Sequence, residues 1–197
     1  MIKNGRQIGT KLQDIRLDHR KRYGYARTKA QEAKVTHIAD VGSGTGYGAY
    51  MLAEAGFLVD SFEIDPEAVA YGNKHWSHPN LRRHIADLAD LSGLKADFVT
   101  MFEIIEHTDK APAFMANLKA DFLVGSVPNE EVVQFETATH WQHYRHYTPE
   151  QFEEELIKAS WLPVETGCQI GKTGPDAHIR TDTTNGRTLV YYANRCL

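Results

Sequence analysis

The stretch ADVGSGTGYG, residues 39–48, places four alternating glycines after a short apolar run that begins at Val35. The run predicts a buried parallel strand over residues 35–41, and residues 45–55 predict a helix that ends at Gly56. Glycines between a strand and a helix permit a tight turn, and they let a ligand approach the bare backbone at the positive end of the helix. The stretch therefore predicts a nucleotide-binding loop in an α/β domain.

The alternation of strand and helix patterns continues along the chain. Asp65 and Pro66 are typical of the N-cap and first turn of a helix, which we expect to extend to residue 75. Further strands are expected at residues 57–64, 81–86, 97–103, 122–127, 161–169 and 187–194, and further helices at residues 109–118 and 149–160. The last two strands are joined by a long polar loop, for which we expect mobility, instead of a helix. The pattern predicts an α/β fold: a Rossmann-like, seven-stranded, mostly parallel sheet with an antiparallel last strand and helices on both faces.

Composition and length are those of a single globular domain. The chain has 197 residues, of which 42% are hydrophobic and 24% charged, and this balance excludes wholesale disorder. No apolar run approaches the roughly 18–20 residues that a membrane span requires, and the first residues lack the apolar middle of a secretory signal. Two cysteines cannot form a disulfide framework. We therefore expect a cytoplasmic protein without a membrane partner.

Charge is unevenly distributed between residues 1–34 and residues 35–197. The first segment has ten Lys or Arg residues against three acids, a balance of +7, which leaves −11 for the remainder of a chain with a net charge of −4. We expect residues 1–34 to form a basic helical N-terminal arm of one or two short helices without a strand, interrupted at Gly24 and packed through Tyr23 and Tyr25. Such an arm is either a solvated segment or a surface that steers an anionic acceptor towards the main domain, residues 35–197.

Glu63 lies 21 residues after Gly42, at the end of the second predicted strand. A carboxylate at this place can accept hydrogen bonds from both hydroxyls of a ribose. A dinucleotide-binding loop needs the pattern Gly-x-Gly-x-x-Gly, whereas Gly42, Gly44 and Gly46 alternate. Asp40, at the end of the first strand, also suits the amine of an amino acid better than a phosphate. The spacing therefore disfavours a nicotinamide- or flavin-dependent oxidoreductase.

These motifs resemble those of the class I S-adenosylmethionine-dependent methyltransferases. The similar segments are ADVGSGTGYG, FEIDPEAV, HIADLADL, FVTMFEIIEH, GSVPN and HYRHYTPEQF, which follow the family's order over residues 35–165. The later segments are most similar to a broad subgroup that includes small-molecule, quinone and sugar O-methyltransferases. One departure is the segment LKAD, residues 118–121, where relatives usually have a proline-glycine turn.

The resemblance implies S-adenosylmethionine as cofactor and assigns residues to its parts. The methionine part would be held by Asp40, Gly42, Ser43, Gly44 and Gly46; the ribose by Glu63; and the adenine by Ile64, Asp87 and Leu88, with Phe102 also in the cofactor site.

Groups for the methyl acceptor are expected after the fourth and fifth strands, at the carboxyl edge where open α/β sheets bind ligands. The polar candidates there are Glu103, Glu106, His107, His140, His143, Arg145 and His146. We expect Glu106, His107 and His143 to be catalytic, with one of the two histidines as the general base, because imidazole titrates near neutral pH. Trp141, Tyr144 and Tyr147 either form a lid over the acceptor or pack the loop. The expected acceptor is an oxygen of a small molecule or sugar.

Two alternatives remain open at this stage. Glu103, Glu106, His107 and His143 resemble the metal site of the small-RNA 3′-terminal 2′-O-methyltransferases, so a divalent metal and a nucleic-acid acceptor form the second reading. We favour a pocket without metal, because metal-free members of the wider family often carry Glu-His at this place. The third reading is a non-catalytic partner protein that binds S-adenosylmethionine. The sequence sets no oligomeric state.

Overall fold

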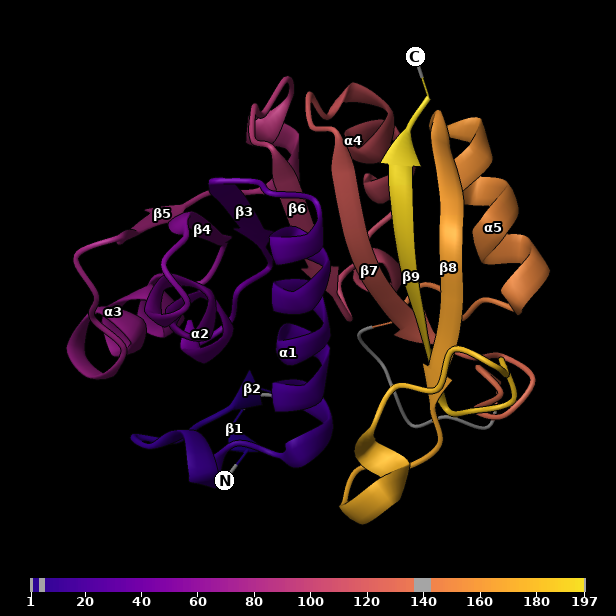
Figure 1. The fold of residues 1–197 in the computed structure, drawn as a ribbon, viewed down its shortest axis with the longest axis horizontal. Coiled ribbons are helices and arrows are strands. Elements are labelled where there is room, and N and C mark those ends of the chain that lie inside the picture. The colour runs from indigo at the N-terminus through magenta and orange to yellow at the C-terminus, as the bar shows by residue number, and fades with distance from the viewer. Residues whose placement is uncertain (1, 4–5, 137–142, 197) are drawn as a thin grey trace.

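The central element of the fold is a seven-stranded sheet in the order β5-β4-β3-β6-β7-β9-β8 (Figure 1). The computed structural model describes residues 2–3, 6–136 and 143–196. The strands are β3 (His37–Val41), β4 (Leu58–Glu63), β5 (Leu81–Ile85), β6 (Phe98–Phe102), β7 (Phe122–Pro128), β8 (Trp161–Gln169) and β9 (Thr188–Arg195). Neighbouring strands are parallel except where β9 pairs with β7 and β8. The predicted Rossmann-like sheet is confirmed, and its antiparallel last strand lies between β7 and the edge strand β8.

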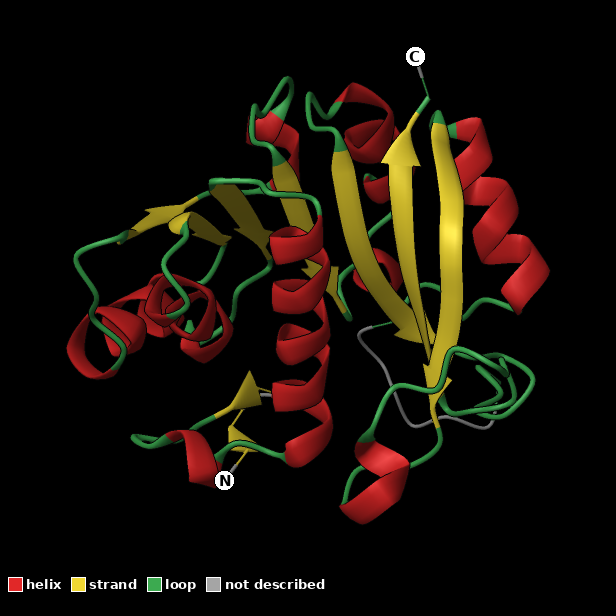
Figure 2. Cartoon of the chain, viewed as in Figure 1, coloured by secondary structure: helices red, strands yellow, loops and turns green. Residues whose placement is uncertain are grey.

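Helices cover both faces of the sheet (Figure 2). They are α1 (Leu17–Glu32), α2 (Tyr47–Glu54), α3 (Pro66–His75), α4 (Ala111–Asn117) and α5 (Pro149–Lys158). The first three pack in one hydrophobic cluster and the last two in the other. Asp65 caps α3 as predicted, because its side chain accepts a hydrogen bond from the amide of Glu67.

The segment before residue 35 differs in part from its prediction. Two short strands, β1 (Ile2–Lys3) and β2 (Arg6–Gln7), pair in antiparallel fashion where no strand was expected. Pairings of two residues carry no recognisable sequence period, which explains the error. The helix α1 runs without interruption through Gly24, so the predicted break there is wrong. Its buried side chains pack against α2 and the sheet, so this helix is part of the core.

The polar segment between β8 and β9 is partly ordered by contacts with α1. It contains a 3₁₀ helix, η4 (Gly174–Ala177). The side-chain amide of Gln169 donates hydrogen bonds to the carbonyl oxygens of Asp18 (2.9 Å) and Ala177 (2.6 Å). The end of the sheet and the beginning of α1 are therefore tied together. None of the helices in the described part of the chain combines the length and apolar character needed to cross a bilayer.

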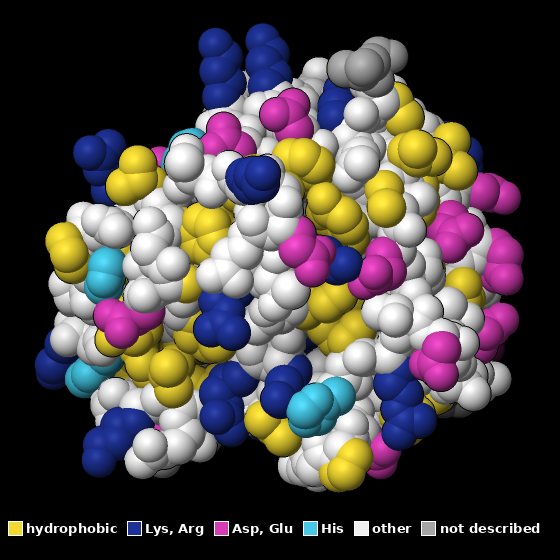
Figure 3. Space-filling view, in the orientation of Figure 1, with side chains coloured by type: hydrophobic (Ala, Val, Ile, Leu, Met, Phe, Trp, Pro, Cys, Tyr) yellow, Lys and Arg dark blue, Asp and Glu magenta, His cyan; other side chains and the backbone are white. Residues whose placement is uncertain are grey.

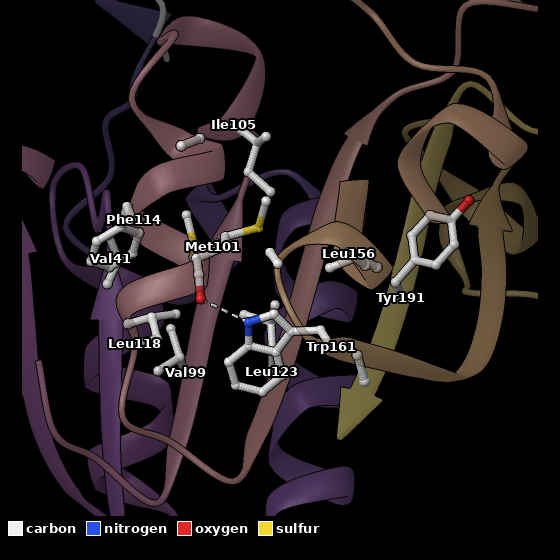
Figure 4. Close-up of a cluster of buried hydrophobic side chains, with 14 of the residues drawn as sticks. Val41, Val99, Met101, Ile105, Phe114, Leu118, Leu123, Leu156, Trp161 and Tyr191 are labelled. Carbon is white, nitrogen blue, oxygen red and sulfur yellow. Dashed lines mark hydrogen bonds between the residues drawn. The ribbon is translucent and has the colours of Figure 1, made fainter. Parts of the chain in front are cut away.

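Among the described residues, Trp161 is the largest fully buried side chain. It packs in one cluster with Leu118 after the end of α4, Leu123 of β7 and Leu156 of α5 (Figure 4). Its indole N–H donates to the carbonyl oxygen of Met115 at 2.9 Å. The packing and the hydrogen bond together fix the first residue of β8 against the helices.

We expect Trp161→Ala to lower the free energy of unfolding by about 3–5 kcal/mol, because it opens a cavity and leaves the Met115 carbonyl without its donor. Leu162→Ala is the matched control, since Leu162 is 56% exposed. Its loss should be about 0.5 kcal/mol or less. Urea denaturation of both variants measures the difference, and equal losses would contradict the role assigned to Trp161.

Candidate functional site

Three glycines of the loop after β3 adopt backbone conformations that L-residues avoid. The φ angles of Gly42, Gly44 and Gly46 are +71°, +56° and +81°. A Cβ at Gly42 would lie 2.1 Å from Cδ1 of Ile104, so this loop is in direct contact with the turn that follows β6. A Cβ at Gly44 would meet no described atom within 4 Å. The backbone at Gly44 is thus open to a ligand on the side that a side chain would otherwise cover.

Glu63 joins the glycine loop to the end of β4. Its carboxylate is buried and accepts hydrogen bonds from the amides of Gly44 (2.8 Å) and Asp65 (3.0 Å). The next residue, Ile64, is 58% exposed, which is unusual for a large apolar side chain. The structure therefore places a carboxylate and an exposed apolar surface side by side next to the loop.

Asp87 follows β5 and begins the 3₁₀ helix η2 (Leu88–Leu91). Its carboxylate accepts a hydrogen bond from the amide of Ala89 and lies 3.1 Å from Nζ of Lys110. These two partners, the amide first, lower the pKa of Asp87. Leu88 packs partly against the core, so part of its surface is already covered by protein.

Asp40, the residue before the end of β3, lies in a small hydrogen-bonded network. It accepts hydrogen bonds from the hydroxyls of Thr100 (2.6 Å) and Tyr23 (3.1 Å). Burial raises the pKa of Asp40 to about 7, although the two hydroxyls and Arg83 act in the opposite direction. The ring of Tyr23 also packs edge-on against Phe102, with 4.9 Å between centroids. Asp40 thus holds a proton more readily than an ordinary carboxylic acid.

The turn after β6 begins at Glu103, whose φ of +56° is rare for a residue with a side chain. Its carboxylate accepts a hydrogen bond from Ser126 Oγ at 2.9 Å, and Nη1 of Arg22 lies 3.6 Å from the same oxygen. The turn continues into the 3₁₀ helix η3 (Ile105–His107). Glu103 therefore points towards β7 and α1.

Glu106, His107 and His143 gather at the end of this turn. Glu106 is fully buried, and neither carboxylate oxygen has a hydrogen-bond partner among the described residues. Nε2 of His107 lies 3.9 Å from Oε1 of Glu106, and the rings of His107 and His143 meet edge-on with centroids 4.4 Å apart. Burial, reinforced by the charge of Glu103, raises the pKa of Glu106 well above its usual range. One potential ligand atom from each of the three residues lies within 4.8 Å of the others.

The remaining predicted acceptor residues are divided between core and surface. His146 is buried behind His143, with 2.7 Å between their ring nitrogens. Tyr147 is buried and Tyr144 is 62% exposed, while Arg145 lies over the ring of Tyr147. His140 and Trp141 lie outside the described residues. The amide of Tyr144 donates to the carbonyl oxygen of Glu106 at 2.7 Å and so ties this segment to η3.

Sequence reasoning missed three polar side chains that line the same region. Thr100 holds Asp40, Arg22 approaches Glu103, and Arg83 lies beneath the loop, where its Nε would be 2.8 Å from a Cβ at Gly46. Tyr23 was predicted only as a packing residue, whereas its hydroxyl reaches Asp40. Nothing in the sequence around these residues separates them from ordinary packing or solvated side chains.

A family model for a methyltransferase domain matches residues 16–161. The chain belongs to this methyltransferase family. The matched region begins at residue 16 and therefore includes α1. No curated protein matches the chain.

Solved methyltransferases share this fold at low sequence identity. Magnesium protoporphyrin IX methyltransferase from Synechocystis PCC 6803, with bound S-adenosylhomocysteine, has a TM-score of 0.69 and 19% identity over 96% of this chain and 89% of its own. The methyltransferase domain of bacterial CtHen1 has a TM-score of 0.66 and 16% identity over 91% and 100%. The 1,6-didemethyltoxoflavin N1-methyltransferase of Burkholderia thailandensis has a TM-score of 0.64 and 19% identity over 89% and 79%. The fold is that of the class I enzymes that use S-adenosylmethionine.

The donor set of this methyltransferase fits such a cofactor. The open backbone at Gly44 can take a polar amino-acid group, and the adjacent Glu63 carboxylate can accept hydrogen bonds from hydroxyls. The exposed Ile64 offers an apolar surface for a base. None of these groups depends on a phosphate in the ligand.

The raised pKa of Asp40 predicts a pH dependence of stability. In the unfolded chain an aspartate ionises near pH 4, whereas in the folded protein its pKa is about 7. Between these values the folded state holds the proton that the unfolded state has lost, so stability falls as pH rises through this window. We expect Asp40→Asn to remove up to about 4 kcal/mol of that fall, measured by urea denaturation between pH 4 and 8.

Asp121→Asn, at an exposed aspartate, is the matched control and should follow the wild-type profile. A profile for Asp40→Asn that coincides with the wild type would show that Asp40 ionises as an ordinary carboxylic acid in the fold.

Proposed function

We propose that this methyltransferase transfers the methyl group of S-adenosylmethionine to an oxygen of a small molecule or sugar. The observation that carries the proposal is the fully buried Glu106 beside the imidazoles of His107 and His143. Glu106 and His107 follow Ile104, which lies against Gly42, so these two residues are close to the glycine loop.

The loop and its neighbours would hold the cofactor. The methionine part would be bound by Asp40, Gly42, Ser43, Gly44 and Gly46. Glu63 would bind the ribose. The adenine would contact Ile64, Asp87 and Leu88, with Phe102 beside them. The open backbone at Gly44 and the exposure of Ile64 support this assignment. Two backbone amides already hold the Glu63 carboxylate beside the loop, so the side chain need not turn to bind the ribose.

S-adenosylmethionine supplies an electrophilic methyl group on a sulfonium. The acceptor oxygen attacks the methyl carbon in line with the carbon–sulfur bond, and the bonding pair of that bond stays on sulfur. The chain's own contribution is to orient the acceptor and to take its proton. His107 or His143 serves as that base. Burial disfavours the ionised form of Glu106, which lies 3.9 Å from His107, and the imidazolium that forms there would favour its carboxylate.

We expect Glu106→Gln and His107→Ala to lower kcat by about 10²–10⁴-fold, the usual contribution of a general base and its orienting partner. The dissociation constant of S-adenosylmethionine should change less than twofold, because neither side chain belongs to the glycine loop. Formation of S-adenosylhomocysteine with a panel of hydroxylated small molecules and sugars measures turnover, and calorimetry measures binding.

His75→Ala is the matched control, since His75 stacks on Tyr71 in α3. Full turnover in both test variants would contradict the proposed roles. Binding of S-adenosylmethionine without transfer to any acceptor would instead favour a non-catalytic partner protein.

A second candidate is metal-assisted methylation of a nucleic acid at a 3′-terminal 2′-hydroxyl. It is favoured by the ligand atoms of Glu106, His107 and His143, which lie within 4.8 Å of one another, because a mixed carboxylate–imidazole set suits Mn, Fe, Co or Zn. The fourth candidate ligand, Glu103, is directed to Ser126 and Arg22 instead. Lys and Arg side chains gather over the lower end of α1, while acidic side chains gather over the α5 side (Figure 3). A basic patch of this kind suits an anionic acceptor.

Chelation separates the two candidates. We expect turnover of a hydroxylated small molecule to persist in excess EDTA, because the proposed base is an imidazole of the chain. Metal analysis of the purified protein should show less than stoichiometric Mn, Fe, Co and Zn. Loss of activity that Mn²⁺ restores, with methylation of an RNA end but not of the same strand ending in a 2′-deoxynucleotide, would establish the second candidate.

A further inference from the structure

The helix α1 presents two consecutive polar side chains, Arg22 and Tyr23, to the interior. Arg22 is 2% exposed and Tyr23 is 6% exposed. Burial of a guanidinium is costly unless the charge is paired. A surface helix that only covered a sheet would gain more from an apolar residue at position 22. The charge of Arg22 therefore calls for a role beyond packing.

Arg22 faces the first residue of the turn after β6. Its Nη1 atom lies 3.6 Å from Oε1 of Glu103, and Ser126 Oγ donates to the same oxygen from β7. The backbone of Glu103 has a φ of +56°, a conformation that costs about 1–3 kcal/mol and that surrounding contacts must maintain. The side chain of Glu103 is thus held from two elements, α1 and β7.

Tyr23 makes the corresponding contact on the cofactor side. Its hydroxyl donates to Asp40, and its ring lies on Gly48, where a Cβ would come within 1.9 Å of the ring. Adjacent residues of one helix therefore contact the two halves of the site: Tyr23 the strand and helix that flank the glycine loop, and Arg22 the turn that leads to η3.

We infer that Arg22 is a positioning residue for the acceptor side of the reaction. Through Glu103 it fixes the turn that carries Glu106 and His107, and it leaves the cofactor contacts to Tyr23 and the glycine loop. The expected change in kcat rests on the proposed function, whereas the expected effect on the position of the turn rests on its geometry alone.

Arg22→Met, Arg22→Lys, Glu103→Gln and the double variant Arg22→Met/Glu103→Gln test the inference. For Arg22→Met we expect kcat to fall at least tenfold while the dissociation constant of S-adenosylmethionine changes less than twofold. Arg22→Lys retains the cation and should recover most of the loss. The double variant should be about as slow as Arg22→Met, because the two side chains act through one contact.

A readout that needs no turnover keeps the inference separate from the proposed function. The imidazole NMR signals of His107 should shift in Arg22→Met and return towards the wild type in Arg22→Lys, whereas the signals of His75 on α3 should not move. If the wild-type protein methylates no acceptor, the proposed function fails, and these signals still decide the role of Arg22.

Four outcomes would overturn the inference. Arg22→Met could weaken S-adenosylmethionine binding tenfold or more with kcat unchanged, which would make Arg22 a cofactor ligand. The losses of Arg22→Met and Glu103→Gln could be additive, or the His107 signals could stay fixed. Should Arg22→Met fail to fold because it leaves Glu103 unpaired, the double variant removes both charges, and wild-type kcat in that variant would equally refute the inference.

Discussion

No side chain fits at residue 42, because Ile104 occupies the space in which a Cβ would stand. This contact joins the loop after β3 to the turn after β6, two parallel neighbours in the centre of the sheet. Parallel neighbouring strands end at the same edge of the sheet, so the segments that follow them must share a small volume. The absence of a side chain at Gly42 lets the side chain of Ile104 pack against the loop, and this contact would fix the distance between the proposed cofactor on one connection and the proposed base on the other.

The same volume contains an unusual number of buried ionisable groups. Asp40, Glu63, Glu106 and Arg22 are all buried within or beside these connections. Three of them have fixed partners: hydroxyls for Asp40, amides for Glu63 and Glu103 for Arg22. A core built for stability alone would contain apolar residues at such positions. The arrangement is the pattern expected where stability is given up for a site that orients charge.

Local signals determined what the sequence could predict. Alternating glycines, the Asp65–Pro66 cap and the apolar runs each act within a few residues, and the strands and helices that they predict match the structure from β3 to β9. The proximity of Glu106, His107 and His143 was also predictable, because the first two are adjacent in sequence and the third follows the neighbouring strand.

The roles of α1 could not be predicted from the sequence. Arg22 and Tyr23 contact Glu103 and Asp40 across the fold, and nothing in the pattern of α1 separates these two side chains from its solvated ones. The sequence also does not distinguish Glu103 from Glu106, whereas in the structure Glu103 has a φ of +56° and its carboxylate is held by Ser126 and Arg22.

The buried carboxyl group of Glu106 connects structure to chemistry. Both of its oxygens lack a donor in the described part of the chain, and full burial makes its ionised form costly until a cation or a proton arrives. In the proposed reaction an imidazolium at His107 would be such a cation, formed when a histidine accepts the proton of an attacking hydroxyl. The interaction between Glu106 and His107 is then weak before proton transfer and strong during it. An interaction that strengthens only as the reaction proceeds lowers the barrier without tightening the binding of the ground state. In the proposed O-methylation, the base needs a partner of this kind: a buried acid with no hydrogen-bond donor among the described residues.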